Sequence, residues 1–213
     1  MVYETVDTHA SIRQGDIFRD IPRADLSLGR LTVLDDGNTL RDRTWHEVLL
    51  ESGEKRGVVA MLSLLPVHGI VITQDCDAAR SEFVSLCQID EYVKTTGLST
   101  PPKTANKWQS RIVSHSRQNA RWFYLPEDVE FGFSSRMAAD FRVTIRLPRV
   151  ELMEFRDLRL GRLNDESCEH FRESLAQFFR RYPYDEWYPL TKDEYAAYAE
   201  DKDEFVRPRP WQE

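Results

Sequence analysis

An acid–thiol–acid triplet, Asp75-Cys76-Asp77, directly follows an apolar stretch and is the most distinctive chemical feature of the sequence. Carboxylate, imidazole and thiolate groups bind divalent cations, and a cysteine among them favours zinc. The candidate metal ligands are Asp75, Asp77, His68 and Cys76, although no CxxC or HxxxH spacing accompanies them. The candidate cofactor is therefore a divalent metal ion.

The same segment has two other interpretations. Thr73, Asp75 and Asp77 could be catalytic, with the aspartates holding a metal or acting as the base in hydrolysis of a phosphodiester bond. A Cys76 nucleophile is disfavoured, because neighbouring carboxylates raise the pKa of a thiol. Alternatively the turn is structural: the aspartates cap it, Cys76 is a small buried hydrophobic residue, and Arg80 pairs with an aspartate.

The structure of the residues before the triplet determines in which directions its three side chains point. Residues 70–73 (IVIT) are apolar on both faces, which is typical of a central strand buried on both sides. If the strand continues through residue 77, Asp75 and Asp77 share a face with Thr73 and Cys76 points the other way. If the chain turns at residue 75, the three side chains of the triplet can converge.

A basic block forms a second candidate site. Between Lys94 and Pro126 there are six positive charges and no carboxylate, although the whole chain has a net charge of −7. A helix over residues 104–115 places cations four residues apart on one face, and nucleic-acid surfaces combine cations with aromatic rings. The candidate nucleic-acid-binding residues are Lys103, Lys107, Arg111, Arg117, Arg121 and Trp108. The alternative is an ordinary solvated helix whose charges pair with the acidic flanks and whose Trp108 lies in the core.

Composition limits the class of protein. The chain has 213 residues, 41% of them hydrophobic, which is enough for a real core. No run approaches the roughly 20 apolar residues that span a bilayer, and the N-terminus has no signal-peptide pattern. Three cysteines indicate reduced thiols rather than a disulfide framework. We therefore expect a cytoplasmic protein without a membrane partner.

The expected elements give an α+β fold. The first 90 or so residues indicate short strands and turns without a helix pattern, including a strand over 45–50. Later strands are expected at 83–89, 121–125 and 141–147, the last with alternating apolar and polar residues. A C-terminal helix begins at Asn164 or Asp165, and a capping box at Thr191 opens another.

Together these elements predict a curled, mostly antiparallel SH3-like sheet or barrel with C-terminal helices. We expect a β-rich core domain with one inserted helix over residues 1–150, a helical extension packed on it over 151–200, and a loose tail over 201–213.

Two resemblances rest on these motifs. Residues 14–18 (QGDIF), 70–77 (IVITQDCD) and 83–89 resemble an uncharacterised group of bacterial proteins, which share a strand like 123–126 (FYLP) and a C-terminal helix. This resemblance covers most of the chain and implies no established activity. Residues 15–17 and 71–73 are more loosely similar to two strands of the PemK/MazF toxins, SH3-like barrels that cut RNA, although His68-Gly69 replaces that family's Arg-Pro.

The leading hypothesis is a bacterial nucleic-acid-interacting protein, a toxin-like or defence-associated component that hydrolyses phosphodiester bonds. Its binding surface would be the 103–121 block, beside Thr73, Asp75 and Asp77. One alternative is a non-catalytic interaction subunit whose basic helix docks an acidic protein. Another is a metal-binding protein that uses Asp75, Cys76 and Asp77.

Overall fold

The computed structural model describes residues 2–7, 9–34, 39–52, 58–98, 100–118 and 121–180. The chain divides into two compact units, Met1–Phe178 and Phe179–Glu213. The helix expected from Thr191 and the tail expected over 201–213 lie outside the described residues. Almost all the described residues belong to the first of these units.

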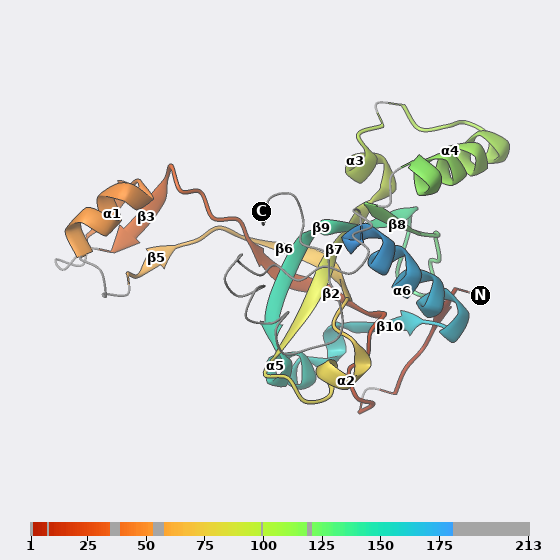
Figure 1. Cartoon of the computed structure of the whole chain (residues 1–213), viewed down its shortest axis with the longest axis horizontal. Coiled ribbons are helices and arrows are strands. Elements are labelled where there is room, and N and C mark those ends of the chain that lie inside the picture. Colours follow the sequence, from red (N-terminus) through yellow and green to blue (C-terminus); the bar gives the residue numbers. More distant parts are fainter. Residues whose placement is uncertain are drawn as a thin grey trace, which may run out of the picture. The chain divides into compact units, whose positions relative to one another are not determined.

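The main sheet has seven strands, and each strand is antiparallel to its neighbours (Figure 1). In spatial order the strands are β1 (Tyr3–Glu4), β10 (Arg159–Leu163), β2 (Asp16–Ala24), β6 (Leu64–Val71), β7 (Phe83–Glu91), β9 (Met137–Pro148) and β8 (Trp122–Leu125). The expected α+β class with mostly antiparallel strands is confirmed. The SH3-like barrel is not, because the described strands form open sheets that do not close on themselves.

The described helices alternate with these strands along the chain. They are α1 (Trp45–Ser52), α2 (Asp75–Ala78), α3 (Tyr92–Thr96), α4 (Ala105–Gln118), α5 (Arg149–Glu154) and α6 (Asp165–Phe179), with a 3-10 turn at Arg156–Leu158. Among the described residues, no helix has the length and apolar character needed to cross a membrane.

The centre of the main sheet is buried on both faces, as expected for residues 70–73, although only Ile70 and Val71 of that stretch are fully buried. Ile17 and Ile70 belong to one hydrophobic cluster, and their neighbours Phe18 and Val71 belong to another. Because successive strand residues point to opposite faces, this alternation fills a core on each side of the sheet. Helix α6 covers the first core through residues such as Phe171.

Helix α6 begins where the sequence predicts. The Asn164 Oδ1 atom accepts a hydrogen bond from the Ser167 amide at 2.8 Å, which caps the helix. The segment before it is not part of a helical extension. It forms β10, which lies between β1 and β2 in the main sheet, so the chain continues as one unit through residue 150.

A smaller unit is inserted between β2 and β6. It consists of α1 and a three-stranded antiparallel sheet in the order β4 (Leu40–Arg43), β3 (Leu31–Leu34), β5 (Ala60–Met61). The strand expected over 45–50 is wrong, because this segment is α1. The Thr44 amide donates to a Glu47 carboxylate oxygen at 2.7 Å and the Glu47 amide donates to the Thr44 hydroxyl at 3.3 Å, a reciprocal cap that starts the helix.

Candidate functional site

The two motif segments, residues 14–18 and 70–77, lie side by side because β2 pairs with β6. Gln14 joins them: its backbone amide donates to Asp75 Oδ1 at 2.8 Å, and its side-chain Nε2 donates to the Ile72 carbonyl at 2.9 Å. The Cys168 thiol of α6 donates to the Gln14 carbonyl at 3.3 Å. Gln14 is buried, so these contacts satisfy polar groups that water does not reach.

Arg172 of α6 completes this junction. Its Nη2 donates to Asp75 Oδ2 at 2.7 Å and its Nε donates to Gln14 Oε1 at 3.0 Å. Burial would raise the pKa of Asp75, but the Gln14 amide and the guanidinium groups of Arg172 and Arg13 hold it below its usual value. Asp75 is therefore ionised at neutral pH and already neutralised by arginine.

Asp16, the acidic residue of the QGDIF motif, lies in an even more enclosed ion-pair cluster. Its side chain is 0% exposed, and it accepts from Arg159 Nη2 at 2.5 Å, from Arg162 Nε at 2.9 Å and from the Arg13 amide at 2.8 Å. Both arginines come from β10, which pairs with β2. We call Gln14, Asp16, Asp75, Arg159, Arg162 and Arg172 the arginine–carboxylate network.

The predicted catalytic residues do not form one constellation. The chain turns after β6, so Asp75 faces Gln14 and Arg172. Thr73 Oγ1 instead accepts from the Ser85 amide at 2.8 Å and fastens the end of β6 to β7, while Asp77 is exposed. The contacts of Thr73 and Asp75 thus hold the turn after β6 against β7, the loop before β2 and α6.

The structural interpretation of the triplet needs three corrections. Cys76 is exposed rather than buried, because α2 turns it to the surface. Arg80 does not pair with an aspartate: its Nε donates to the Cys76 carbonyl at 2.8 Å. Asp75 links two loops rather than capping its own turn, since the described cap of α2 has no side-chain hydrogen bond.

The four candidate metal ligands are not assembled. Within the described residues, no group of three or more His, Cys, Asp and Glu side chains is arranged to hold a metal ion. His68 packs near Phe133, with ring centroids 5.9 Å apart, and burial lowers its pKa below the usual value. It is therefore a neutral, half-buried ring in a different environment from Asp75.

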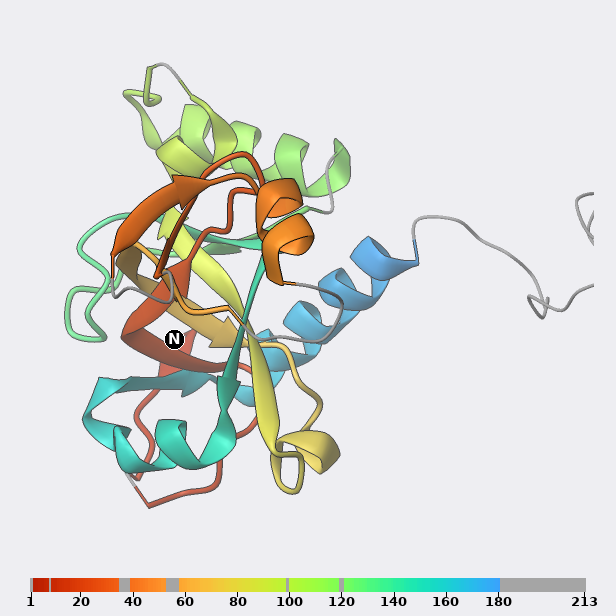
Figure 2. The same ribbon diagram turned by 90° about the vertical axis from the view of Figure 1, so that its left-hand side faces the viewer.

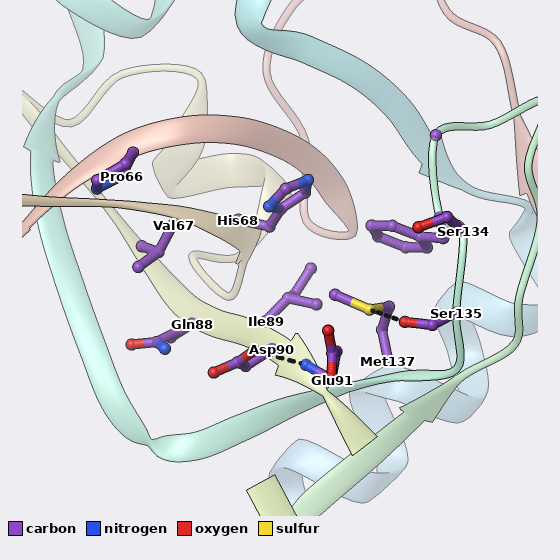
Figure 3. A pocket seen from close by; sticks show the side chains of 12 residues that line it. Pro66, Val67, His68, Gln88, Ile89, Asp90, Glu91, Ser134, Ser135 and Met137 are labelled. Carbon is purple, nitrogen blue, oxygen red and sulfur yellow. Dashed lines mark hydrogen bonds between the residues drawn. The ribbon is translucent and has the colours of Figure 1, made fainter. Parts of the chain in front are cut away.

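His68 lines a small pocket of about 280 Å³ together with side chains from β7 and the loop before β9. Figure 3 shows His68 on one side and Glu91, Ser134 and Ser135 on the other. The Glu91 carboxylate is 3.3 Å from Lys94 Nζ. This pocket has polar walls but is not part of the arginine–carboxylate network.

The basic block forms the expected helix, α4, and its charges are divided between two roles. Ion pairs with carboxylates are formed by Lys94 and Arg121. Among the described residues, no ion pair is formed by Lys103, Lys107 or Arg111, and all three are exposed. We call these three residues the cationic stripe.

The other predicted members of this surface differ from the stripe. Trp108 packs against the Tyr92 ring at 5.9 Å between centroids, and the Arg136 guanidinium lies 4.7 Å from its ring centroid. Arg121 donates to Asp140 at 2.9 Å and stacks over Trp122. Arg117 lies in α4, and its side chain is outside the described residues. Trp108 and Arg121 thus attach this region to the sheet.

The triplet and the stripe do not form one surface. Helix α2 precedes β7 and α3 follows it, and the nine residues of β7 span about 30 Å. In both views α2 lies with α5 at one end of the main sheet, and α3 and α4 lie at the other (Figure 1, Figure 2). The expectation that the stripe lies beside Thr73, Asp75 and Asp77 is therefore wrong.

The arginine–carboxylate network was not foreseen as a unit. Gln14, Asp16 and Asp75 stand in the quoted motifs, but their guanidinium partners are far away in the sequence. Arg159 is 143 residues from Asp16, and Arg172 is 97 residues from Asp75. No known protein family matches the chain, and neither does any curated protein. The two resemblances therefore stay predictions.

Proposed function

We propose that this chain binds nucleic acid through the cationic stripe of α4. The observation that carries the proposal is that Lys103, Lys107 and Arg111 are exposed and have no carboxylate partner among the described residues. The sequence also has no acidic residue from Lys94 to Pro126 that could neutralise them. Unpaired cations on an acidic chain favour an anionic partner.

The spacing of the stripe suits a polymer better than a single small anion. Lys107 and Arg111 are one helical turn apart, about 6 Å along the axis. A nucleic-acid backbone presents phosphates in a row, so successive cations can each neutralise one and release its counterion. We therefore propose that the stripe contacts phosphates, which position a protein on nucleic acid without carrying sequence information directly.

The test is fluorescence anisotropy of a labelled oligonucleotide at several salt concentrations. The affinity should fall linearly with the logarithm of salt, and Lys107→Ala and Arg111→Ala should each reduce the slope by about 0.7–0.9. Arg80→Ala, at the other end of the sheet, is the matched control and should leave the slope unchanged. Absent or salt-independent binding contradicts the proposal and favours the docking of an acidic protein on the same stripe.

Hydrolysis of phosphodiester bonds, a toxin-like or defence-associated role, and metal binding stay predictions. Asp77 is the predicted catalytic residue that remains exposed. Its substitution in a nuclease assay tests whether the α2 turn has any chemical role, independently of binding by the stripe.

A further inference from the structure

The inserted unit exposes an unusual share of the apolar side chains of this chain. In the described part of the chain, eighteen large hydrophobic side chains are exposed, and eleven of them lie in this unit, between residues 26 and 62. The core of the unit is small, with Leu31, Val33 and Val48 as its buried residues. Units of roughly 40 residues rarely bury enough surface alone, and apolar patches of this kind mark interaction surfaces.

Among the described strands, β5 is an open edge of that unit, because the sheet order is β4-β3-β5. The Leu34 amide donates to the Val59 carbonyl at 2.9 Å, so the main-chain groups of Val59 face β3. Main-chain groups of successive strand residues point in opposite directions. The N–H and C=O of Ala60 therefore point to the open edge.

The two edges of this sheet differ in charge. Strand β4 contains Arg41, Asp42 and Arg43, the kind of charged edge that discourages pairing with another chain. Residues 57–74, which include β5, contain no Lys, Arg, Asp or Glu. Native proteins normally cover an uncharged apolar strand edge with another part of the chain or with a partner. The open side of β5 is therefore a position where another strand can pair.

The side chains around β5 also alternate. Val58, Ala60 and Leu62 line an apolar groove of about 390 Å³ beneath α1. Val59 and Met61, 66% and 61% exposed, alternate with them and so point to the opposite face. Because residues 58–62 are all apolar and uncharged, an antiparallel copy of the same segment meets neither a buried charge nor a like charge.

We propose that β5 pairs with β5 of a second copy of this chain, antiparallel and about a two-fold axis at Ala60. Such an interface is isologous, so one segment supplies both sides. Each Ala60 N–H donates to the other Ala60 carbonyl, and Val59 lies opposite Met61 of the second copy. The two small sheets become one of six strands, with both apolar grooves on the same face. This association is separate from the binding proposed for α4.

The first test measures the mass of the full chain by sedimentation over a range of concentrations. We expect a dimer that dissociates on dilution, and Met61→Lys should weaken it. The two lysines would lie diagonally across the strand pair, about 7–8 Å apart on one face, where like charges repel. Val129→Lys is the matched control, because Val129 is 71% exposed and lies outside the inserted unit. Circular dichroism checks that both variants remain folded.

The second test fixes the register. In a Cys76→Ser background, Val59→Cys combined with Met61→Cys should give a disulfide-linked dimer on oxidation. The two positions face each other across a non-hydrogen-bonded pair with Cα atoms about 4.5 Å apart. Either single cysteine should cross-link far less, since its partner position is not a cysteine. A chain that stays monomeric at every concentration, or a dimer whose dissociation constant Met61→Lys leaves unchanged, overturns the proposal.

Discussion

The arginine–carboxylate network and the cationic stripe both gather basic side chains, but their surroundings are opposite. In the network, Arg159 and Arg162 are 5% and 12% exposed and meet an aspartate that is completely buried. In the stripe, Lys107 and Arg111 lie in solvent, and no described carboxylate pairs with them. The network uses its charges inside the fold, whereas the stripe leaves them for a partner.

A distinctive sequence motif and a binding surface therefore need not coincide. Gln14, Asp16 and Asp75 are the chemically distinctive residues, yet they join β2, β6, β10 and α6 to one another. The less distinctive cations of the stripe, Lys103, Lys107 and Arg111, are the groups left available. Substitutions should therefore separate stability from binding.

Asp16→Ala should have the largest effect. It leaves the guanidinium groups of Arg159 and Arg162 buried without their carboxylate, and breaking a buried pair in this way costs about 3–5 kcal/mol. Urea denaturation measures the loss. Asp77→Ala, an exposed aspartate, is the control and should change stability by less than about 0.5 kcal/mol. A loss for Asp16→Ala as small as the control would refute the role given to the network.

Gly15→Ala should be the next most damaging change. Gly15 has φ of +88°, and an added Cβ would lie 3.0 Å from Cys168 Sγ, so strain and crowding combine to cost about 1–3 kcal/mol. Gly97→Ala is the matched control: Gly97 has φ of +67° but nothing within 4 Å of its Cβ position. Thermal unfolding should show a smaller loss for Gly97→Ala. Equal losses would mean that crowding against α6 contributes nothing.

Asp75→Asn should cost up to about 1 kcal/mol at neutral pH, because the side chain is 35% exposed and solvent screens its ion pairs. The pKa of Asp75 is lower in the folded than in the unfolded chain. Its stabilising contribution is therefore complete above the unfolded pKa, about 4, and is lost as pH falls through the folded pKa. Denaturant unfolding at several pH values should show wild type and variant converging in acid. A gap that widens on acidification contradicts this sign.

Lys107→Ala should have the smallest effect on stability, within about 0.5 kcal/mol, because the side chain is exposed and has no described ion-pair partner. The same variant should weaken binding to the oligonucleotide. Measuring both quantities on one preparation separates the stripe from the network. A large loss of stability would show that Lys107 belongs to the internal contacts after all.

Much of the fold was predictable because local patterns determined it. The both-face burial of Ile70 and Val71, the alternation in β9 and the capped start of α6 all follow from periodicity and capping chemistry. Helix α1 was missed although its capping box, Thr44 and Glu47, is visible in the sequence. Its short apolar run fits a buried strand as well as a helix, so periodicity alone predicts the wrong element.

The site was much less predictable, because tertiary pairing decides it. Whether Asp75 is a ligand, a base or an anchor depends on Arg172, which only the packing of α6 brings within 2.7 Å. Asp16 likewise depends on β10, a short strand that was not expected. The stripe was foreseen, since helical spacing alone places Lys107 and Arg111 on one face.

The position of β10 also bears on how the chain folds during synthesis. Strand β2 ends at Ala24, but the neighbour that brings the guanidinium partners of Asp16 is not complete until Leu163. At 5–20 residues per second, translation of the residues between them takes about 7–30 s. Throughout that interval one side of β2 lacks its neighbour and the Asp16 carboxylate must stay hydrated. The main sheet is therefore complete only after β10 has been synthesised. Until then β2 can pair with a wrong strand, because its own neighbour does not yet exist.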